Sequence, residues 1–578
     1  MDRRTLIKMA AIGGAANVLS DVANAASDAR AVTVRSAGTS GHSYSPALNR
    51  LVAYARQDLA TAGMPGLTLC IVDAEGYAAV ASDGWADVDR RIPVNPSHLF
   101  QIASISKSFA ALCVYRLADE GKIDLDAPVS RYIPDAPLPP EPISVQQVLS
   151  HTAGLPRSSS VFPRVPEKRL WTGFAPGSKF SYSNTGYYLI GLLIERVTGK
   201  PYQAALRNLI VKPLGITGLR EAIQASDRAR YAVGYSPIDA GGPNMPHVPL
   251  GPTQWLDRDV ASGCVGVTAD AMIPYLQFLM YVGRGQGKPL FSDAMAKRFS
   301  RIVEPAAVAA FGKGAGYASG LEIIDFDGGK AFQHTGTTCG FTSSLTVDFA
   351  SGVGCFVSVN AFNGGYRPDS ITKYACRLLR QVREGRTISA PGAGISLEYV
   401  EHAEDFAGTY VGPNGDRFQL TARAGHLQIT ANGQNGRLQA VGRQTFLSDH
   451  PRFGSHFFEF ERGGDDVLNV WFGGVLYGRG VALPQPPVPP ELAALEGIYV
   501  SPDPLSGWRR AVIAEGNRLV IENLSIYRVK NTLVRQGNYW HPQAADNPCE
   551  RIWFEDSIGG VPQRLNISGL DMWRFHEI

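Results

Sequence analysis

The pattern of apolar and polar positions divides the chain into two parts. From about Ser45 to Gly385 helical and strand patterns follow one another, whereas beyond 384–394 short alternating segments are broken by Gly, Asn and Asp. Strands are predicted over 66–73, 77–83, 330–334, 341–349 and 353–360, and helices over 46–62, from Ser104 onward, over 187–197 and over 369–383. Because strands lie at both ends of the first part and helices in its middle, we expect an antiparallel sheet built from both ends.

The second part of the chain repeats itself. Phe406–Val411 (F-A-G-T-Y-V) returns after about ninety residues as Leu495–Val500 (L-E-G-I-Y-V), and both copies lead into similar turn-then-strand segments. Such a spacing is too long for a solenoid and suits two copies of one small β-domain. The proline-rich run 484–490 lies between the copies as a stiff linker. The short alternating segments favour an up-and-down barrel or a sandwich in each copy.

The first residues have the form of an export signal. Arg3 and Arg4 precede a mildly apolar run, 9–19, which is too short to span a bilayer, and Ala23-Asn24-Ala25 has the small-x-small form of a cleavage site. The pattern resembles a twin-arginine signal. No other stretch approaches about 18 consecutive apolar residues, so we expect a periplasmic or secreted mature protein with no integral membrane span.

Composition and charge indicate a folded protein of several domains. Of the 578 residues, 44% are hydrophobic and 19% are charged, with 55 Lys and Arg against 52 Asp and Glu. No basic stripe interleaved with aromatic residues is present, so nucleic acid is not an expected partner. The seven cysteines are odd in number and form no C-x-x-C pair, which argues against a disulfide framework; we expect buried thiols.

The first candidate for chemistry is S-I-S-K at 104–107, at the start of an apolar helix. Residues three apart lie on one helical face, so the Ser104 hydroxyl and the Lys107 amine can meet. A serine hydroxyl is a weak nucleophile until a base takes its proton, and a partly buried lysine near other cations can be neutral enough to help. The S-x-x-K spacing alone is weak evidence, because an N-cap serine followed by a solvated lysine gives the same pattern.

Two further segments make the pattern specific. Y-S-N at 182–184 precedes an apolar helix, and H-T-G-T at 334–337 lies at the end of a predicted strand. In order and spacing, S-x-x-K, Y-x-N and H-T-G resemble the three motifs of the serine β-lactamase and penicillin-binding superfamily. The resemblance is to the branch of class C β-lactamases, D-aminopeptidase, DD-carboxypeptidases and related esterases. It spans about 47–383 and includes H-T-A-G-L-P at 151–156 and A-S-G at 261–263.

The resemblance implies roles for the first two motifs. Ser104 would be the nucleophile, and Lys107 would tune the proton path. Tyr182 would be the general base for acylation and the acid for the leaving group, with nearby cations lowering its pKa. Asn184 would orient Lys107 and the substrate amide.

The third motif differs from that of class C β-lactamases. His334 stands where class C β-lactamases carry Lys, whereas D-aminopeptidase and several peptidases of the branch carry His, which disfavours a dedicated β-lactamase. The resemblance implies that the amides of Ser104 and Thr337 form the oxyanion hole, and Thr335 and Gly336 belong to the same substrate-binding and oxyanion-binding strand.

Two other segments favour structural interpretations. His151 is expected to brace the site region rather than to react, and D-F-D-G-G at 325–329 is expected to be a hairpin turn rather than a calcium loop. No H-E-x-x-H or clustered His and Cys pattern occurs, so we infer no metal and no cofactor.

The predicted fold class is α+β. A β-lactamase/transpeptidase-like catalytic domain, with an antiparallel sheet flanked by helices and a helical subdomain, is followed by two small antiparallel β-barrel-like domains. The predicted limits are 1–25 for the signal peptide, 26–385 for the catalytic domain, 386–397 for a linker, 398–482 for the first β-domain, 483–490 for the proline-rich linker and 491–578 for the second β-domain.

The predicted function is an exported serine hydrolase with an acyl-enzyme mechanism, most consistent with a peptidase on small peptides, as in D-aminopeptidase or carboxypeptidase. Because the same chemistry accepts esters and lactams, an esterase or a weak β-lactamase is one alternative. A protein of another class, a non-hydrolytic penicillin-binding receptor or scaffold, is the other. The expected partner is a small peptide, amide or ester substrate.

Overall fold

The computed structural model describes residues 33–37, 41–238, 248–303, 314–391, 399–464, 466–502, 509–524, 528–543 and 549–575. The signal segment predicted at 1–25 lies outside these residues. The chain divides into one unit of residues 1–236, 249–362 and 366–392 and another of 237–248, 363–365 and 393–578. No helix in the described ranges is both long enough and apolar enough to cross a membrane.

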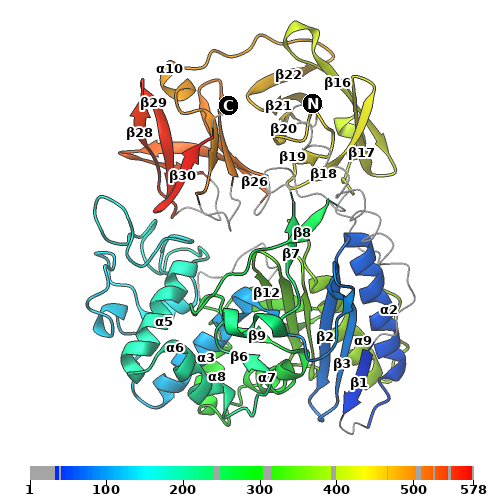
Figure 1. The fold of residues 1–578 in the computed structure, drawn as a ribbon, viewed down its shortest axis with the longest axis vertical. Coiled ribbons are helices and arrows are strands. Elements are labelled where there is room, and N and C mark those ends of the chain that lie inside the picture. Colours follow the sequence, from blue (N-terminus) through cyan, green and yellow to red (C-terminus); the bar gives the residue numbers. More distant parts are fainter. Residues whose placement is uncertain are drawn as a thin grey trace. The chain divides into compact units, whose positions relative to one another are not determined.

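The first unit is built around an antiparallel sheet with the order β1-β3-β2-β14-β13-β12-β11-β10, and β4 pairs with β3. Its strands are β1 (Thr33–Ala37), β2 (Gly66–Asp73), β3 (Ala78–Asp87), β4 (Ile92–Pro93), β10 (Gly316–Tyr317), β11 (Glu322–Phe326), β12 (Gly329–Thr337), β13 (Thr342–Asp348) and β14 (Val353–Val359). Strand β2 pairs with β14 in the middle of the sheet. The prediction that both ends of this part build one sheet is therefore confirmed (Figure 1).

Helices cover both faces of this sheet. Helix α9 (Asp369–Arg383) packs on β13 and β14 with α2 (Ser45–Ala62) against it, and α7 (Ala269–Gly283) packs on β2 and β14. The other helices described in this unit are α3 (Ser106–Asp119), α4 (Val145–Leu149), α5 (Asn184–Thr198), α6 (Tyr202–Leu206) and α8 (Asp293–Phe299). Side chains of β13 alternate: Ser344 and Thr346 bond to Thr372 of α9, whereas Leu345 and Val347 enter the core that α7 shares. Because both faces are covered, every residue of β2, β13 and β14 is buried.

Short strands and turns complete the first unit. Strand β9 (Gly266–Val267) lies between β5 (Phe100–Gln101) and β6 (Leu219–Arg220), and β7 (Tyr235–Pro237) pairs with β8 (Leu250–Pro252). Strands β11 and β12 form a hairpin whose turn residues Asp327 and Gly328 both have positive φ, 48° and 82°, so the predicted hairpin turn is confirmed.

The second unit contains two closed eight-stranded antiparallel barrels in its described residues. The first consists of β15 (Gly408–Val411), β16 (Arg417–Arg423), β17 (His426–Ala431), β18 (Gln434–Ala440), β19 (Thr445–Ser448), β20 (Phe458–Gly463), β21 (Asp466–Phe472) and β22 (Val475–Arg479). The second follows the short helix α10 (Pro490–Ala493) and consists of β23 (Gly497–Val500), β24 (Arg509–Glu515), β25 (Arg518–Asn523), β26 (Val529–Gln536), β27 (Tyr539–Pro542), β28 (Ile552–Ile558), β29 (Val561–Ile567) and β30 (Leu570–Arg574). Of the two architectures that the sequence favoured, the up-and-down barrel is the one observed.

The repeated segment has the same role in both barrels. Tyr410 and Tyr499 are fully buried, and their hydroxyls donate to backbone oxygens four residues earlier, Phe406 O at 3.0 Å and Leu495 O at 2.9 Å. Each segment forms the first strand of its barrel and pairs with the last one, which closes the cylinder. The sequence repeat thus marks the closure point of each barrel.

The structure shows where the seven cysteines lie. Six are buried and Cys339 is partly exposed. The expectation of buried thiols is confirmed for all except Cys339.

Candidate active site

Ser104 lies in a single 3₁₀ turn, Ala103–Ile105, which leads directly into α3. The turn is held on both sides: Ile102 N donates to Val265 O at 3.0 Å, and Val265 N donates to Ser106 Oγ at 3.0 Å. Residue Ala103, just before the serine, has a φ of 49°, a conformation uncommon for a non-glycine residue. Ile105 takes the N-cap position of α3 without a side-chain cap bond. Ser104 therefore does not act as the N-cap residue of this helix.

Lys107 lies against Ser104 in the first turn of α3. Its Nζ donates to Ser104 Oγ at 3.1 Å and to Ser262 O, in the A-S-G segment, at 2.8 Å. The side chain is fully buried. Burial lowers the pKa of Lys107 well below its usual value, and the nearby charge of Arg157 lowers it further. The alternative of a solvated lysine does not apply here.

Tyr182 lies in the turn before α5 and Asn184 is the first residue of that helix, and His151 holds the turn in place. Ser181 N donates to His151 O at 2.8 Å, and Ser183 N donates to His151 Nδ1 at 3.1 Å, so the bonds of His151 bracket Tyr182 on both sides. Ser183 is the N-cap of α5, and its Oγ accepts from Gly186 N. This cap starts the helix three residues before the predicted boundary at 187.

The ring of Tyr182 lies near His151, His334 and Lys107. Its centroid is 4.2 Å from that of His151 and 6.4 Å from that of His334, and Lys107 Nζ lies 5.0 Å from it. Asn184 donates from Nδ2 to Ser158 Oγ at 3.2 Å. Its expected role in orienting Lys107 and the substrate remains a prediction.

His334 is held as a neutral imidazole with a defined tautomer. Its Nδ1 lies 2.6 Å from Thr335 O, which can only accept, so Nδ1 carries the proton. Its Nε2 lies 3.1 Å from the hydroxyl of fully buried Tyr317, which must then donate. Burial and the charge of Lys107 lower the pKa of His334 to about 3, against the smaller raising effect of the bond to Thr335. Both ring nitrogens are therefore occupied.

The rest of the third motif is the end of β12. A Cβ at Gly336 would lie 2.1 Å from Ile102 O, so only glycine lets this strand approach the turn that carries Ser104. Thr335 and Thr337 flank this contact on the same strand, within β12. The assignment of the Ser104 and Thr337 amides to an oxyanion hole remains a prediction.

Comparison with known proteins agrees with this arrangement. Residues 51–376, more than half of the chain, match the family model described as Beta-lactamase. The chain belongs to the beta-lactamase family.

Curated relatives match only part of this beta-lactamase-family chain. It is 30% identical over 195 residues to Protein flp of Staphylococcus aureus strain N315, a match over 31% of this chain and 39% of that protein. It is 28% identical over 173 residues to Penicillin-binding protein 4* of Bacillus subtilis strain 168, over 27% of this chain and 38% of that protein. The matches thus span less than two-fifths of the length of these relatives.

Among solved structures, the octameric penicillin-binding protein homologue from Pyrococcus abyssi superposes with a TM-score of 0.54 at 24% identity, covering 74% of this chain and 99% of that one. This likeness supports the shared fold.

Two residues of this beta-lactamase-family site were missed in the sequence. Tyr317 was overlooked because it lies on the two-residue strand β10, outside any motif, and bonds His334 across the sheet. Arg157 was overlooked although it directly follows the H-T-A-G-L-P segment; its guanidinium carbon lies 5.3 Å from the Tyr182 ring centroid. The available signal was that Arg157 follows a segment expected to support the site.

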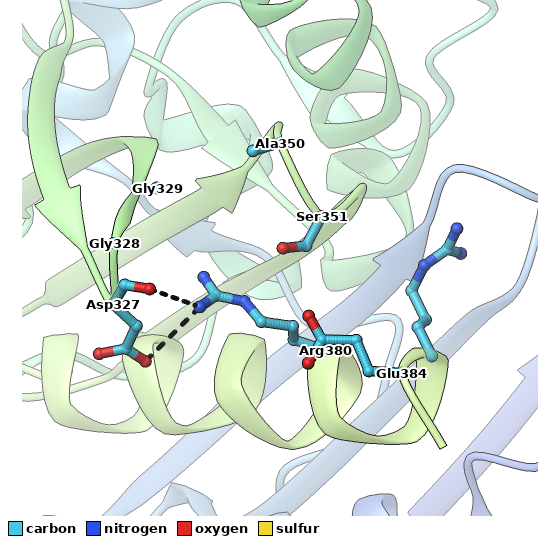
Figure 2. A pocket seen from close by; sticks show the side chains of 8 residues that line it. Asp327, Gly328, Gly329, Ala350, Ser351, Arg380 and Glu384 are labelled. Carbon is cyan, nitrogen blue, oxygen red and sulfur yellow. Dashed lines mark hydrogen bonds and ion pairs between the residues drawn. The ribbon is translucent and has the colours of Figure 1, made fainter. Parts of the chain in front are cut away.

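A pocket of about 470 Å³ lies elsewhere in the first unit (Figure 2). It is lined by the β11–β12 turn, the β13–β14 turn and the end of α9, and by none of the motif residues. Arg380 points into it but is bound to Asp348 and to the carbonyl of Asp327. Its charge is therefore already compensated within the fold.

Proposed function

We propose that this protein is an exported serine hydrolase that forms an acyl-enzyme on Ser104 and cleaves amide bonds in small peptides. The observation that carries the proposal is the contact of Lys107 Nζ with Ser104 Oγ at 3.1 Å, made by a fully buried amine. Burial lowers the pKa of Lys107 and so favours its neutral form, and a neutral amine can accept the serine proton. Export rests on the sequence alone, since residues 1–25 lie outside the described part.

The reaction consists of two balanced halves. Ser104 Oγ bonds to the substrate carbonyl carbon while its proton passes to the Lys107 and Tyr182 pair. The tetrahedral intermediate then collapses, the carbon–nitrogen bond breaks, and the pair returns the proton to the leaving amine. Water attacks the resulting ester in the same way, so that the acid product leaves and Ser104 recovers its proton.

The neutral state of His334 supports a proton transfer by Lys107 and Tyr182 rather than by His334. Its Nδ1–H is bound to Thr335 O and its Nε2 to Tyr317, so neither nitrogen is available to Ser104 in this arrangement. His334 is better suited to shaping the β12 side of the site. An uncharged His334 side chain is also compatible with an uncharged amide or ester group at the substrate position that follows the scissile bond.

The nucleophile is tested with Ser104→Ala. We expect this variant to lose all covalent labelling by a fluorophosphonate and all hydrolysis while keeping the wild-type circular dichroism spectrum, since Ser104 supplies no cap bond. Ser108→Ala is the matched control, because it also removes a hydroxyl from α3, one that bonds Ile105 O and Tyr275. Full hydrolysis by Ser104→Ala would disprove the proposal.

The substrate class is tested with purified protein and a panel of compounds. Turnover of D- or L-aminoacyl anilides supports a peptidase, whereas turnover of a nitrophenyl ester or a chromogenic cephalosporin alone supports an esterase or a weak β-lactamase. Stoichiometric, long-lived labelling by penicillin without steady-state hydrolysis would indicate a receptor or scaffold instead.

A further inference from the structure

Two basic side chains lie near the ring of Tyr182. Lys107 Nζ lies 5.0 Å and the Arg157 guanidinium carbon 5.3 Å from its centroid. Arg157 is tied to the Tyr-x-Asn turn through its backbone, since Asn184 N donates to Arg157 O at 2.7 Å. Its side chain is half-buried. The backbone of Arg157 is thus anchored to the segment that carries Tyr182 and Asn184.

The histidines around Tyr182 are neutral. His151 is a neutral imidazole, because its Nδ1 accepts from Ser183 N and burial lowers its pKa well below the usual value. His334 is neutral for the reasons given above. Neither ring can supply positive charge to the site at neutral pH.

Three further groups near Tyr182 do not supply a lasting positive charge either. Tyr187 and Tyr317 are fully buried phenols whose pKa is raised well above its usual value by burial. Lys107 must give up its charge to act as a base. Arginine, in contrast, keeps its proton throughout the working range of proteins.

We propose that Arg157 is a positioning residue that supplies the permanent positive charge of the active site and stabilises negative charge on Tyr182 while the Ser104 proton is transferred. The inference rests on the proposed acyl-enzyme function. It explains how a site whose histidines are both neutral can still draw a proton from a phenol. The same charge also favours the neutral form of Lys107, because two like charges repel.

The expected effect is a shift of the pH profile rather than a uniform loss. A positive charge about 5 Å away, partly screened by solvent, shifts the pH at which the base forms downward by about one unit. Removing it should move the acid limb of kcat/KM upward by about that amount. At pH values well above the limb the base is formed in any case, so the rates should converge.

The test compares wild type, Arg157→Gln and Arg157→Lys. Two profiles are measured from about pH 5 to pH 9, kcat/KM for a nitrophenyl ester and the rate of Ser104 labelling by a fluorophosphonate. We expect Arg157→Gln to shift both acid limbs upward by about one unit and Arg157→Lys to remain close to wild type. Arg169→Gln is the matched control, because it removes an exposed charge from the same connection.

Ionic strength provides a second measurement that requires no variant. Because Arg157 is half-exposed, raising the salt concentration from about 0.02 M to about 0.5 M should move the wild-type acid limb upward and leave that of Arg157→Gln nearly unchanged.

The outcomes separate this inference from the proposed function. If wild-type Ser104 is labelled but Arg157→Gln keeps the wild-type limb, or loses the same factor at every pH, the role of Arg157 is disproved while the acyl-enzyme mechanism stands. If wild-type Ser104 is not labelled at any pH, both proposals fail.

Discussion

At the scale of single residues, the environment of Lys107 decides its chemistry. The amine is fully buried, donates to Ser104 Oγ and Ser262 O, and has a pKa well below its usual value because burial disfavours the charged form. The spacing of Ser104 and Lys107 could be read from the sequence. The burial of Lys107 could not be predicted from the sequence, because Ser262 lies 155 residues away along the chain and contacts Lys107 only in the folded protein.

Tyr182→Phe is the prediction that belongs to this scale. It removes the hydroxyl but keeps the ring that packs on His151. We expect kcat to fall by about 10²- to 10⁴-fold with a much smaller change in KM, since a general base acts mainly in the transition state. Steady-state kinetics with a nitrophenyl ester measures both constants. A variant that retained kcat but bound substrate poorly would show that Tyr182 binds substrate rather than transferring protons.

At the scale of elements, the site depends on the approach of β12 to the turn that carries Ser104. The strand was predicted to end at His334, whereas it continues to Thr337 and contacts Ile102 at Gly336. Strand and helix types followed from apolar spacing, and α9 has the bounds that were predicted. The end of β12 could not be predicted from apolar spacing, because its last residues are set by pairing with β13.

Gly336→Ala tests this approach. The added Cβ would lie 2.1 Å from Ile102 O, so either strand or turn must move, and we expect a loss of about 1–3 kcal/mol in the free energy of unfolding together with at least a tenfold loss of kcat/KM. Urea unfolding and ester hydrolysis measure the two effects.

Gly329→Ala is the control on the same strand, because its Cβ would meet only ordinary contacts of 3.6 and 3.7 Å. Equal effects of the two substitutions would show that the close contact at Gly336 is not what matters.

At the scale of the whole molecule, buried neutral histidines make stability depend on pH. His334 has a pKa of about 3 and that of His151 is well below its usual value, both because of burial, whereas an unfolded histidine has a pKa of about 6.5. Below that pH the unfolded chain binds protons that the folded protein does not. The stability that these residues contribute is therefore present above about pH 6.5 and is lost as the pH falls toward 3.

The expected slope is up to about 1.4 kcal/mol per pH unit for each histidine. Urea unfolding followed by far-ultraviolet circular dichroism at several pH values measures it. His334→Asn should reduce the slope below about pH 6 by up to that amount, whereas substitution of the exposed His426 by Asn should leave it unchanged. Identical slopes for wild type and His334→Asn would contradict this account.

The sequence by itself determined the element types, the duplicated β-domain and the three motifs with their order, because apolar periodicity, turn residues and reactive side chains are local properties. Only the tertiary structure decided which groups are neutral, which tautomer His334 adopts, and that Tyr317 and Arg157 belong to the site. The physical reason is that the charge of a side chain depends on burial and on neighbours from distant segments. Those neighbours come together only when both ends of the first unit close into one sheet.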